Sequence, residues 1–271
     1  MRVLLAIAGE KIQVNAPSAI IDLVVRRYAA FAIKQPSACS NLSPIVIEVT
    51  SRTPTFSAYF ERSPKARVLA RNAREVTIDG AITGRYDIFA RRGLVEQAQC
   101  LGDIDTMLRL ILSIALPLGG GLLMHGAALN NPLFGAIALC GESGTGKSTA
   151  AAALGAACDE LLVLRPENNT VNLCATPYWR GVPLCTPCQG AVCLTRGGEP
   201  AFAFEHGGEA LRHLARHVVR FVPIEETERA IFALLTFVCK YTPVLSARCP
   251  EGDAYIPYLS EKLGQPLRAA A

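Results

Sequence analysis

The sequence contains one short motif whose residue types and spacing suit phosphate chemistry. Residues 141–148 read Gly-Glu-Ser-Gly-Thr-Gly-Lys-Ser, which matches the P-loop pattern GxxxxGK[ST]. Glycines let the backbone wrap around phosphates with its N–H groups pointing inward. The lysine of such a loop reaches the β- and γ-phosphates, and the serine hydroxyl ligates Mg²⁺. We therefore expect the chain to bind ATP or a similar nucleoside triphosphate together with Mg²⁺.

The loop needs a buried strand before it and a helix after it, because the positive N-terminal end of that helix meets the phosphates. Ala136–Cys140 reads as the buried strand, and Lys147 to about Ala157 reads as an alanine-rich helix. A P-loop does not by itself name the reaction, since ATPases, GTPases and kinases share it. The residues expected to contact nucleotide are Gly141, Glu142, Ser143, Gly144, Thr145, Gly146, Lys147, Ser148 and Thr149.

The residues ahead of the P-loop resemble a known kinase family. Leu122–Leu129 reads Leu-Leu-Met-His-Gly-Ala-Ala-Leu, and a short connection leads to Gly135–Cys140 and the P-loop. This arrangement is similar to the catalytic domain of the HPr kinase/phosphorylase family, which places a His-Gly pair on the strand ahead of the P-loop. His125–Gly126 stands in that place. The chain resembles most the related kinases of peptide natural-product clusters, including those of lasso-peptide pathways.

The resemblance implies roles for three further residues. In the family, a strand after the P-loop helix carries a pair of acidic residues, and Asp159–Glu160 resembles that pair, although only Ser148–Cys158 separates it from the loop. Asp159 is then the general base and Glu160 the acid near the metal, which suits hydroxyl attack and Mg²⁺ binding. His125 is then a catalytic-site histidine close to the phosphates, where its imidazole could hydrogen-bond the transferred phosphoryl group or orient the base. The alternatives are two exposed acids at the start of a strand and a core histidine satisfied by the backbone.

The elements that must position these residues can be predicted from local patterns. Residues 1–100 read as a small α+β module, and residues 101–271 read as the P-loop catalytic domain. The fold class is therefore α+β to α/β, and the resemblance implies a core related to phosphoenolpyruvate carboxykinase and HPr kinase. The predicted strands are Arg2–Ala8, Lys11–Val14, Ile45–Thr50, several within Ala66–Gly93, Leu122–Leu129, Leu133–Cys140, Leu161–Leu164, Thr170–Cys174 and Gly190–Thr195. The predicted helices are Ser18–Ala32, one from Asp103 or Asp105 to Leu116, Gly207–Val219 and Glu225–Cys239.

Two groups of residues outside the P-loop invite other chemistry. The ten cysteines include the pair Cys185 and Cys188, near Cys174 and Cys193, but the irregular spacing argues against zinc. A P-loop implies a reducing cytosol, so we expect reduced core cysteines and no stable disulfide. His213 and His217 alternate with Arg212, Arg216 and Arg220 on a predicted helix. We interpret these residues as a basic face that meets water, with an acidic peptide as the alternative.

Composition bounds the remaining classes. Apolar residues make up 51% of the 271 residues and charged residues 18%, which favours a compact globular protein. The net charge of +4 is small and scattered, so no nucleic-acid partner is expected. The longest apolar run, Leu110–Met124, is broken by Pro117 and three glycines, so no membrane segment is expected. We expect a cytoplasmic protein, and the family's frequent oligomers imply a homo-oligomer.

These observations favour an ATP-dependent kinase that phosphorylates a serine hydroxyl of a small protein or ribosomal precursor peptide. One alternative is a small-molecule kinase that uses free serine or a sugar as the acceptor. Another is a non-catalytic module that binds a peptide under control of nucleotide. The acceptor distinguishes the three hypotheses, and the sequence does not identify it.

Overall fold

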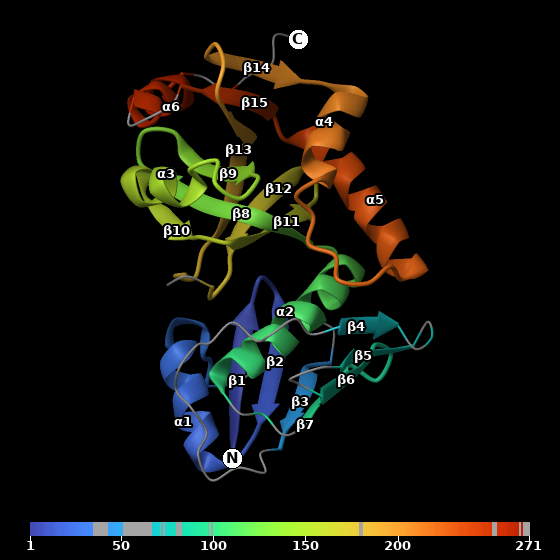
Figure 1. Ribbon diagram of the computed structural model, residues 1–271. Coiled ribbons are helices and arrows are strands. Elements are labelled where there is room, and N and C mark those ends of the chain that lie inside the picture. Colours follow the sequence, from blue (N-terminus) through green and yellow to red (C-terminus); the bar gives the residue numbers. More distant parts are fainter. Residues whose placement is uncertain are drawn as a thin grey trace. The chain divides into compact units, whose positions relative to one another are not determined.

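The structure is a computed structural model in which two compact units are distinguished. One unit consists of Met1–Gly119 and Arg220–Arg229, and the other of Gly120–Val219 and Ala230–Ala271 (Figure 1). Among the described residues, no helix is long and apolar enough to cross a membrane. The described residues are 1–34, 43–50, 67–70, 72, 74–79, 83–96, 98, 100–178, 181–250, 254–265 and 267.

The first unit is built on one mixed sheet. Its strands pair antiparallel except at the β2–β3 and β3–β7 contacts, which are parallel. The alternating burial of β1 and β2 shows that one face of the sheet is covered and the other is open. In spatial order, the strands are β1 (Arg2–Ile7), β2 (Glu10–Asn15), β3 (Ile45–Val49), β7 (Arg92–Glu96), β6 (Thr83–Asp87), β5 (Glu75–Asp79) and β4 (Arg67–Ala70).

Two helices belong to this unit, α1 (Ser18–Arg27), which a 3-10 turn at Ala29–Phe31 follows, and α2 (Leu101–Leu118). A Cβ atom on Gly93 of β7 would lie 3.1 Å from Ile111 Cδ1 and 3.3 Å from Met107 Cε, so α2 lies directly against the sheet. This packing groups α2 with the first unit, whereas the sequence placed residues 101–118 with the P-loop domain.

Polar side chains fix the ends and the core contacts of α2. The helix begins after Cys100, and the Cys100 N–H donates to Asp103 Oδ2 at 3.2 Å in a capping box. Asp103 therefore lies inside the first turn and is not the cap residue. Asp105 is buried, and it accepts hydrogen bonds from Tyr28 Oη at 2.6 Å and Arg109 Nε at 2.9 Å. The prediction of a cap at either aspartate is wrong, because the helix begins at Leu101 and Cys100 occupies the cap position.

The second unit contains a small closed barrel. β8 pairs with β11 and β9, β11 with β12, β12 with β13, and β13 again with β9, so these five strands form a ring. β13 pairs in parallel with both β9 and β15, and the remaining pairs of the unit are antiparallel. The strands are β8 (Leu122–Asn131), β9 (Gly135–Gly141), β10 (Ala156–Cys158), β11 (Leu161–Glu167), β12 (Thr170–Ala175), β13 (Cys185–Arg196), β14 (Ala201–Glu205) and β15 (Val244–Cys249).

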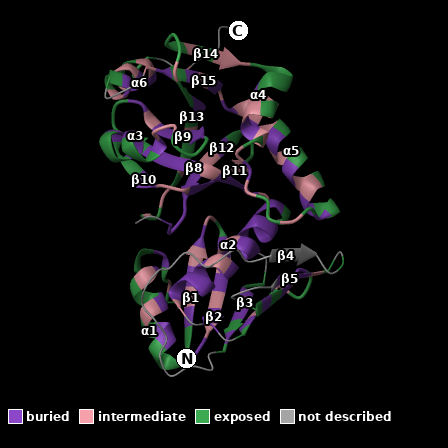
Figure 2. Ribbon diagram, viewed as in Figure 1, coloured by how far each residue is buried: buried purple, intermediate pink, exposed green. Residues whose placement is uncertain are grey.

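Helices cover both faces of the sheet part of this unit. α3 (Lys147–Leu154) and α6 (Tyr255–Leu263) share a core with Ala127, Leu139 and Leu245. Side chains on the other face of β8 and β9, such as Ala128 and Ala138, share a second core with α4 (Gly207–Ala215) and α5 (Glu225–Tyr241). Figure 2 shows β8 and β9 buried along most of their length, as expected for strands with helices on both faces.

Most predicted elements are confirmed, with boundaries shifted by a few residues, and the mixed α/β architecture is confirmed. The helix after the P-loop is shorter than expected, because it ends at Leu154 and Gly155 follows with a φ of 90°. Four elements were not predicted: β10, β14, β15 and α6. The short strand β10 occupies the region that the sequence assigned to the end of the P-loop helix.

Candidate active site

The predicted P-loop connects β9 to α3 at the carboxyl end of two parallel strands. Gly141 ends β9 and pairs with Leu194 of β13, so the loop begins where both strands stop. Ligands of α/β proteins bind at the carboxyl ends of parallel strands. The same end carries the N-terminus of α3, which attracts negative charge. The strand-loop-helix context predicted for the P-loop is therefore present.

The glycines of the loop hold conformations that side chains rarely adopt. Gly144 and Gly146 have φ values of 84° and 91°. Nothing lies within 4 Å of a Cβ position on Gly144, whereas a Cβ atom on Gly146 would lie 2.9 Å from Tyr255 Oη. Tyr255 of α6 donates a hydrogen bond to the Gly146 carbonyl at 2.9 Å. The loop is thus open where phosphates would lie and is held at its base by a helix that the sequence did not predict.

Lys147 is buried, although it carries the charge expected to meet the phosphates. Its Nζ donates a hydrogen bond to the Glu142 carbonyl at 2.6 Å, so the loop closes on its own lysine. Burial lowers the pKa of Lys147, and the negative charge of Asp159 opposes that shift. To bind phosphate, Lys147 would only have to break its hydrogen bond to the Glu142 carbonyl and form new ones to phosphate oxygens.

The other loop residues also fit a nucleotide with Mg²⁺. Thr145 Oγ1 donates to the Glu142 carbonyl at 2.8 Å, which fixes the tip of the loop. Ser143, Ser148 and Thr149 are exposed, so their hydroxyls are open to a ligand. The described residues include no group of three or more His, Cys, Asp or Glu placed to hold a metal. Mg²⁺ needs no such group, since it is commonly held by one or two protein oxygens and by substrate phosphates.

The acidic pair lies in a turn next to the strand that carries His125. Asp159 and Glu160 form the turn between β10 and β11, and the register pairs Leu161 with His125 on β8. The Glu160 N–H donates to Asp159 Oδ1 at 2.8 Å, which holds the first carboxylate in one orientation. Glu160 has a φ of 77°, a strained conformation for a residue other than glycine. Such strain is typical of functional turns.

His125 joins the two halves of this site. The pKa of His125 is lowered mainly by burial and then by the charge of Lys147, while Glu160 and Asp159 oppose the shift. The next residue must be glycine, because a Cβ atom on Gly126 would lie 2.5 Å from the Leu139 carbonyl oxygen. The Gly126 N–H donates to the Glu160 carbonyl at 3.1 Å. The His-Gly pair thus places an imidazole between the P-loop lysine and the acidic turn.

Neighbouring residues fix the position of the acidic turn. Thr176 is fully buried, and its Oγ1 donates to the Leu161 carbonyl at 2.5 Å. The Val182 N–H donates to the Ala157 carbonyl at 2.8 Å. These bonds hold both ends of the turn that carries Asp159 and Glu160. No sequence pattern indicated these two hydrogen bonds, because they join segments that are separated in the chain by loops and not by a regular helix or strand repeat.

A cavity of about 420 Å³ lies against the tip of the P-loop. One wall consists of Glu142–Thr145, and the end of β13 contributes Cys193–Arg196. His213, Arg216 and His217, from α4 and the residues after it, complete the lining. These three residues of the predicted basic face therefore lie beside the P-loop. Arg212 does face solvent, where it pairs with Glu209.

Known proteins give little further guidance. No protein-family model matches the chain, and no curated protein matches it. Among solved structures, the chain is similar to the Hpr(Ser) kinase/phosphatase from Coxiella burnetii, with a TM-score of 0.31 and 14% identity. That match covers 52% of this chain and 92% of the other chain. A likeness at this level transfers no residue role, so the roles proposed for this site rest on its own geometry.

His217 makes the stability of the protein depend on pH. The backbone N–H of His125 donates a hydrogen bond to the His217 carbonyl oxygen at 2.7 Å. Burial, followed by the charges of Lys147 and His125, lowers the pKa of His217 to about 4 from an ordinary value of 6.5. Between those two values the unfolded chain binds more protons than the folded chain, so stability falls as pH drops through this window.

We therefore expect His217→Gln to lose less stability than the wild type between about pH 7 and about pH 5. Urea unfolding at the two pH values measures the difference. His125 keeps part of the pH dependence, since its pKa is lowered in the same direction. His206→Gln is the matched control, because His206 is exposed at the start of α4. An unchanged pH dependence in His217→Gln would contradict the assigned protonation state.

The cysteines differ from expectation in one place. Cys174 and Cys185 form a disulfide, with Cα atoms 4.2 Å apart. The expectation that no stable disulfide forms is wrong for this pair, because the β12–β13 register places the two residues directly opposite each other. Cys188 and Cys193 are free thiols, and burial raises their pKa values to about 11 and about 12. Cys185 is therefore paired with Cys174 and not with Cys188.

Proposed function

We propose that this protein is a cytoplasmic ATP- and Mg²⁺-dependent kinase that phosphorylates a serine hydroxyl of a small protein or ribosomal precursor peptide. The observation that carries the proposal is the meeting of Lys147, His125 and the Asp159–Glu160 turn around one P-loop. A P-loop that only bound nucleotide would need the lysine and the glycines. The additional carboxylate, held by its own backbone, is what a hydroxyl acceptor requires.

Each residue has a distinct task in this proposal. Backbone N–H groups of Gly144–Lys147 bind the phosphates, and Lys147 leaves the Glu142 carbonyl to offset charge on the transferred phosphoryl group. Asp159 accepts the proton of the attacking hydroxyl. His125, with its lowered pKa, is a neutral imidazole that orients Asp159 or donates one hydrogen bond to the phosphoryl group.

Mg²⁺, when bound, would supply positive charge that offsets the negative charge of the phosphates. Ser148 would supply the hydroxyl ligand from the first turn of α3, and Glu160 would supply a carboxylate from the turn beside it. Ser148 lies in α3 after β9, and Glu160 lies in the turn after β10, so the two side chains would reach the ion from different elements.

The cavity beside the loop tip offers room and positive charge for a negatively charged ligand next to the P-loop. Arg196 and Arg216 line the cavity with His213 and His217, opposite the exposed loop residues. The Arg196 guanidinium also lies 4.7 Å from the centre of the Tyr255 ring, which holds its stem in place. A cationic wall next to the phosphate loop attracts negative groups of nucleotide or acceptor into the same space.

A transfer assay with three classes of acceptor tests the proposal. We expect γ-phosphate from ATP to appear on serine-containing peptides and small proteins, in the presence of Mg²⁺, at a rate well above that of ATP hydrolysis alone. Preferential phosphorylation of free serine or a sugar would favour a small-molecule kinase. Nucleotide binding with no transfer to any acceptor would favour a non-catalytic binding module and would contradict the proposed reaction.

A further inference from the structure

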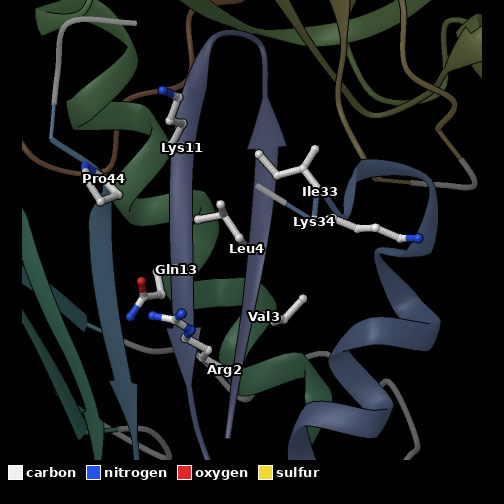
Figure 3. Close-up of a pocket in the computed structure, with 8 residues that line it drawn as sticks. All are labelled: Arg2, Val3, Leu4, Lys11, Gln13, Ile33, Lys34 and Pro44. Carbon is white, nitrogen blue, oxygen red and sulfur yellow. The ribbon is translucent and has the colours of Figure 1, made fainter. Parts of the chain in front are cut away.

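The open face of the first unit carries a hollow that the P-loop chemistry does not use. Its volume is about 330 Å³, and it crosses the edge of the sheet from Pro44 to the Ile33–Lys34 segment (Figure 3). Figure 3 shows Lys11, Leu4 and Gln13 along β1 and β2, with Lys34 on one side and Pro44 on the other. The remaining lining residues are Arg2 and Val3.

The register explains why these side chains share one face. Leu4 lies opposite Gln13, and Lys11 lies opposite Ala6. Partners in an antiparallel pair point to the same side, so Arg2, Leu4, Lys11 and Gln13 share one face. Val3 also borders the hollow, but it alternates with these residues and belongs to the buried side with Leu5 and Ile7. The hollow is therefore part of the outward face of the sheet, with an apolar floor that Leu4, Ile33 and Pro44 form.

The charge of the hollow is one-sided. Arg2, Lys11 and Lys34 line it, no carboxylate does, and none of the three cations has an ion-pair partner among the described residues. In the same unit, Arg91 is paired with Glu10 at 2.5 Å and Arg74 with Asp87 at 3.0 Å. Charges of one sign that remain unpaired around an apolar hollow favour a negatively charged ligand with apolar contacts.

The spacing of the cations selects an extended ligand. Arg2 is four residues from Ala6, the partner of Lys11, and a strand rises about 3.4 Å per residue, so the backbone positions of the two cations are about 14 Å apart along the strands. One phosphate ion cannot bridge that distance. Two carboxylates four residues apart on an extended peptide can. Single-stranded nucleic acid would need aromatic platforms for its bases, and no aromatic residue lines the hollow.

We propose that this hollow is a docking site for an extended acidic peptide segment of a polypeptide partner. The aliphatic floor contacts the side chains between the carboxylates, and Arg2 and Lys11 each meet one carboxylate. Lys34 adds a third positive charge at the side of the hollow. This inference does not depend on phosphate transfer, because it concerns binding in the other unit of the chain.

Fluorescence anisotropy with the full chain tests the site. The probe is a labelled, otherwise uncharged peptide with two glutamates four positions apart, and its matched control carries glutamines instead. We expect the glutamate probe to bind and Arg2→Glu/Lys11→Glu to weaken it about tenfold or more. Added salt should weaken the wild-type complex, because the contacts are exposed. Arg85→Glu, on an outward position of β6 in the same sheet, should bind as the wild type does.

Several outcomes would overturn the proposal. These are equal binding by the wild type and the double variant, equal binding of the glutamate and glutamine probes, and tighter binding of a single-stranded oligonucleotide than of the peptide with the same variant sensitivity. Circular dichroism and thermal unfolding confirm that the double variant is folded. Lys147→Ala should bind the probe normally, so a failed kinase assay and a failed docking site give different results.

Discussion

Lys147→Ala is expected to lower kcat/KM for phosphate transfer by about a thousandfold, which is the effect of removing a preorganised charge from a developing anion. The lysine is buried at the base of the loop, and its charge has been brought out of water before any ligand arrives. It therefore acts on the phosphoryl group without waiting for solvent to reorganise. Transfer of labelled γ-phosphate to the acceptor measures the loss.

Two variants separate this effect from simple damage to the fold. Lys147→Met keeps the aliphatic stem that fills the buried position and should lose as much activity as the alanine variant. Lys240→Ala removes an exposed lysine from α5 and should retain wild-type activity. If Lys147→Met transfers phosphate as fast as the wild type while binding nucleotide, the role assigned to Lys147 is wrong.

Asp159→Asn is expected to lower kcat by about 10²- to 10⁴-fold, the usual contribution of a general base. The amide oxygen can still accept the hydrogen bond that Asp159 Oδ1 receives from the Glu160 N–H. The turn should therefore keep its shape while the proton acceptor is lost. The apparent KM for ATP should change little, because Asp159 acts on the hydroxyl and not on the phosphates.

Steady-state kinetics with varied ATP and varied acceptor separate kcat from KM for this variant. Glu167→Gln is the matched control, since Glu167 is an exposed carboxylate at the other end of β11. It should behave as the wild type does. Full activity in Asp159→Asn would remove the residue from the reaction and leave the acidic pair as a structural turn.

The P-loop could be predicted from sequence because its geometry is local. The glycines at positions 144 and 146 are needed for backbone angles that lie within the motif itself, and the helix starts at the lysine that the motif specifies. The apolar run of β9 was likewise visible because helices cover both of its faces. Each of these features requires only neighbouring residues.

The walls of the site could not be predicted in the same way. His217 reaches the P-loop because its segment pairs with β8, as the Met124–Val218 bridge and the Val219-to-Leu123 hydrogen bond show. That pairing joins residues far apart in the chain. The periodicity of residues 207–219 predicted a basic helix face, but the helix ends at Ala215, so Arg216 and His217 lie beyond it. The periodicity also carried no information on what these residues would meet.

The disulfide and Tyr255 were missed for a related reason. Strand register decides whether Cys174 and Cys185 meet, and register follows from the closure of the barrel through β13. Tyr255 lies on a short helix whose contact with Gly146 spans more than a hundred positions of the chain. A single sequence shows which residue types are available for such contacts, but it does not show which residues pair with each other.

The hydrogen bond from Lys147 to the Glu142 carbonyl makes the empty loop its own competitor for nucleotide. An incoming phosphate gains the lysine only after that bond has broken, so the measured affinity is the intrinsic affinity multiplied by the fraction of open loops. A change that weakens the closed form, without touching any ligand, would therefore tighten nucleotide binding. For the proposed kinase, the conformational equilibrium of the loop, as well as its contacts, would set the ATP concentration needed for half-saturation.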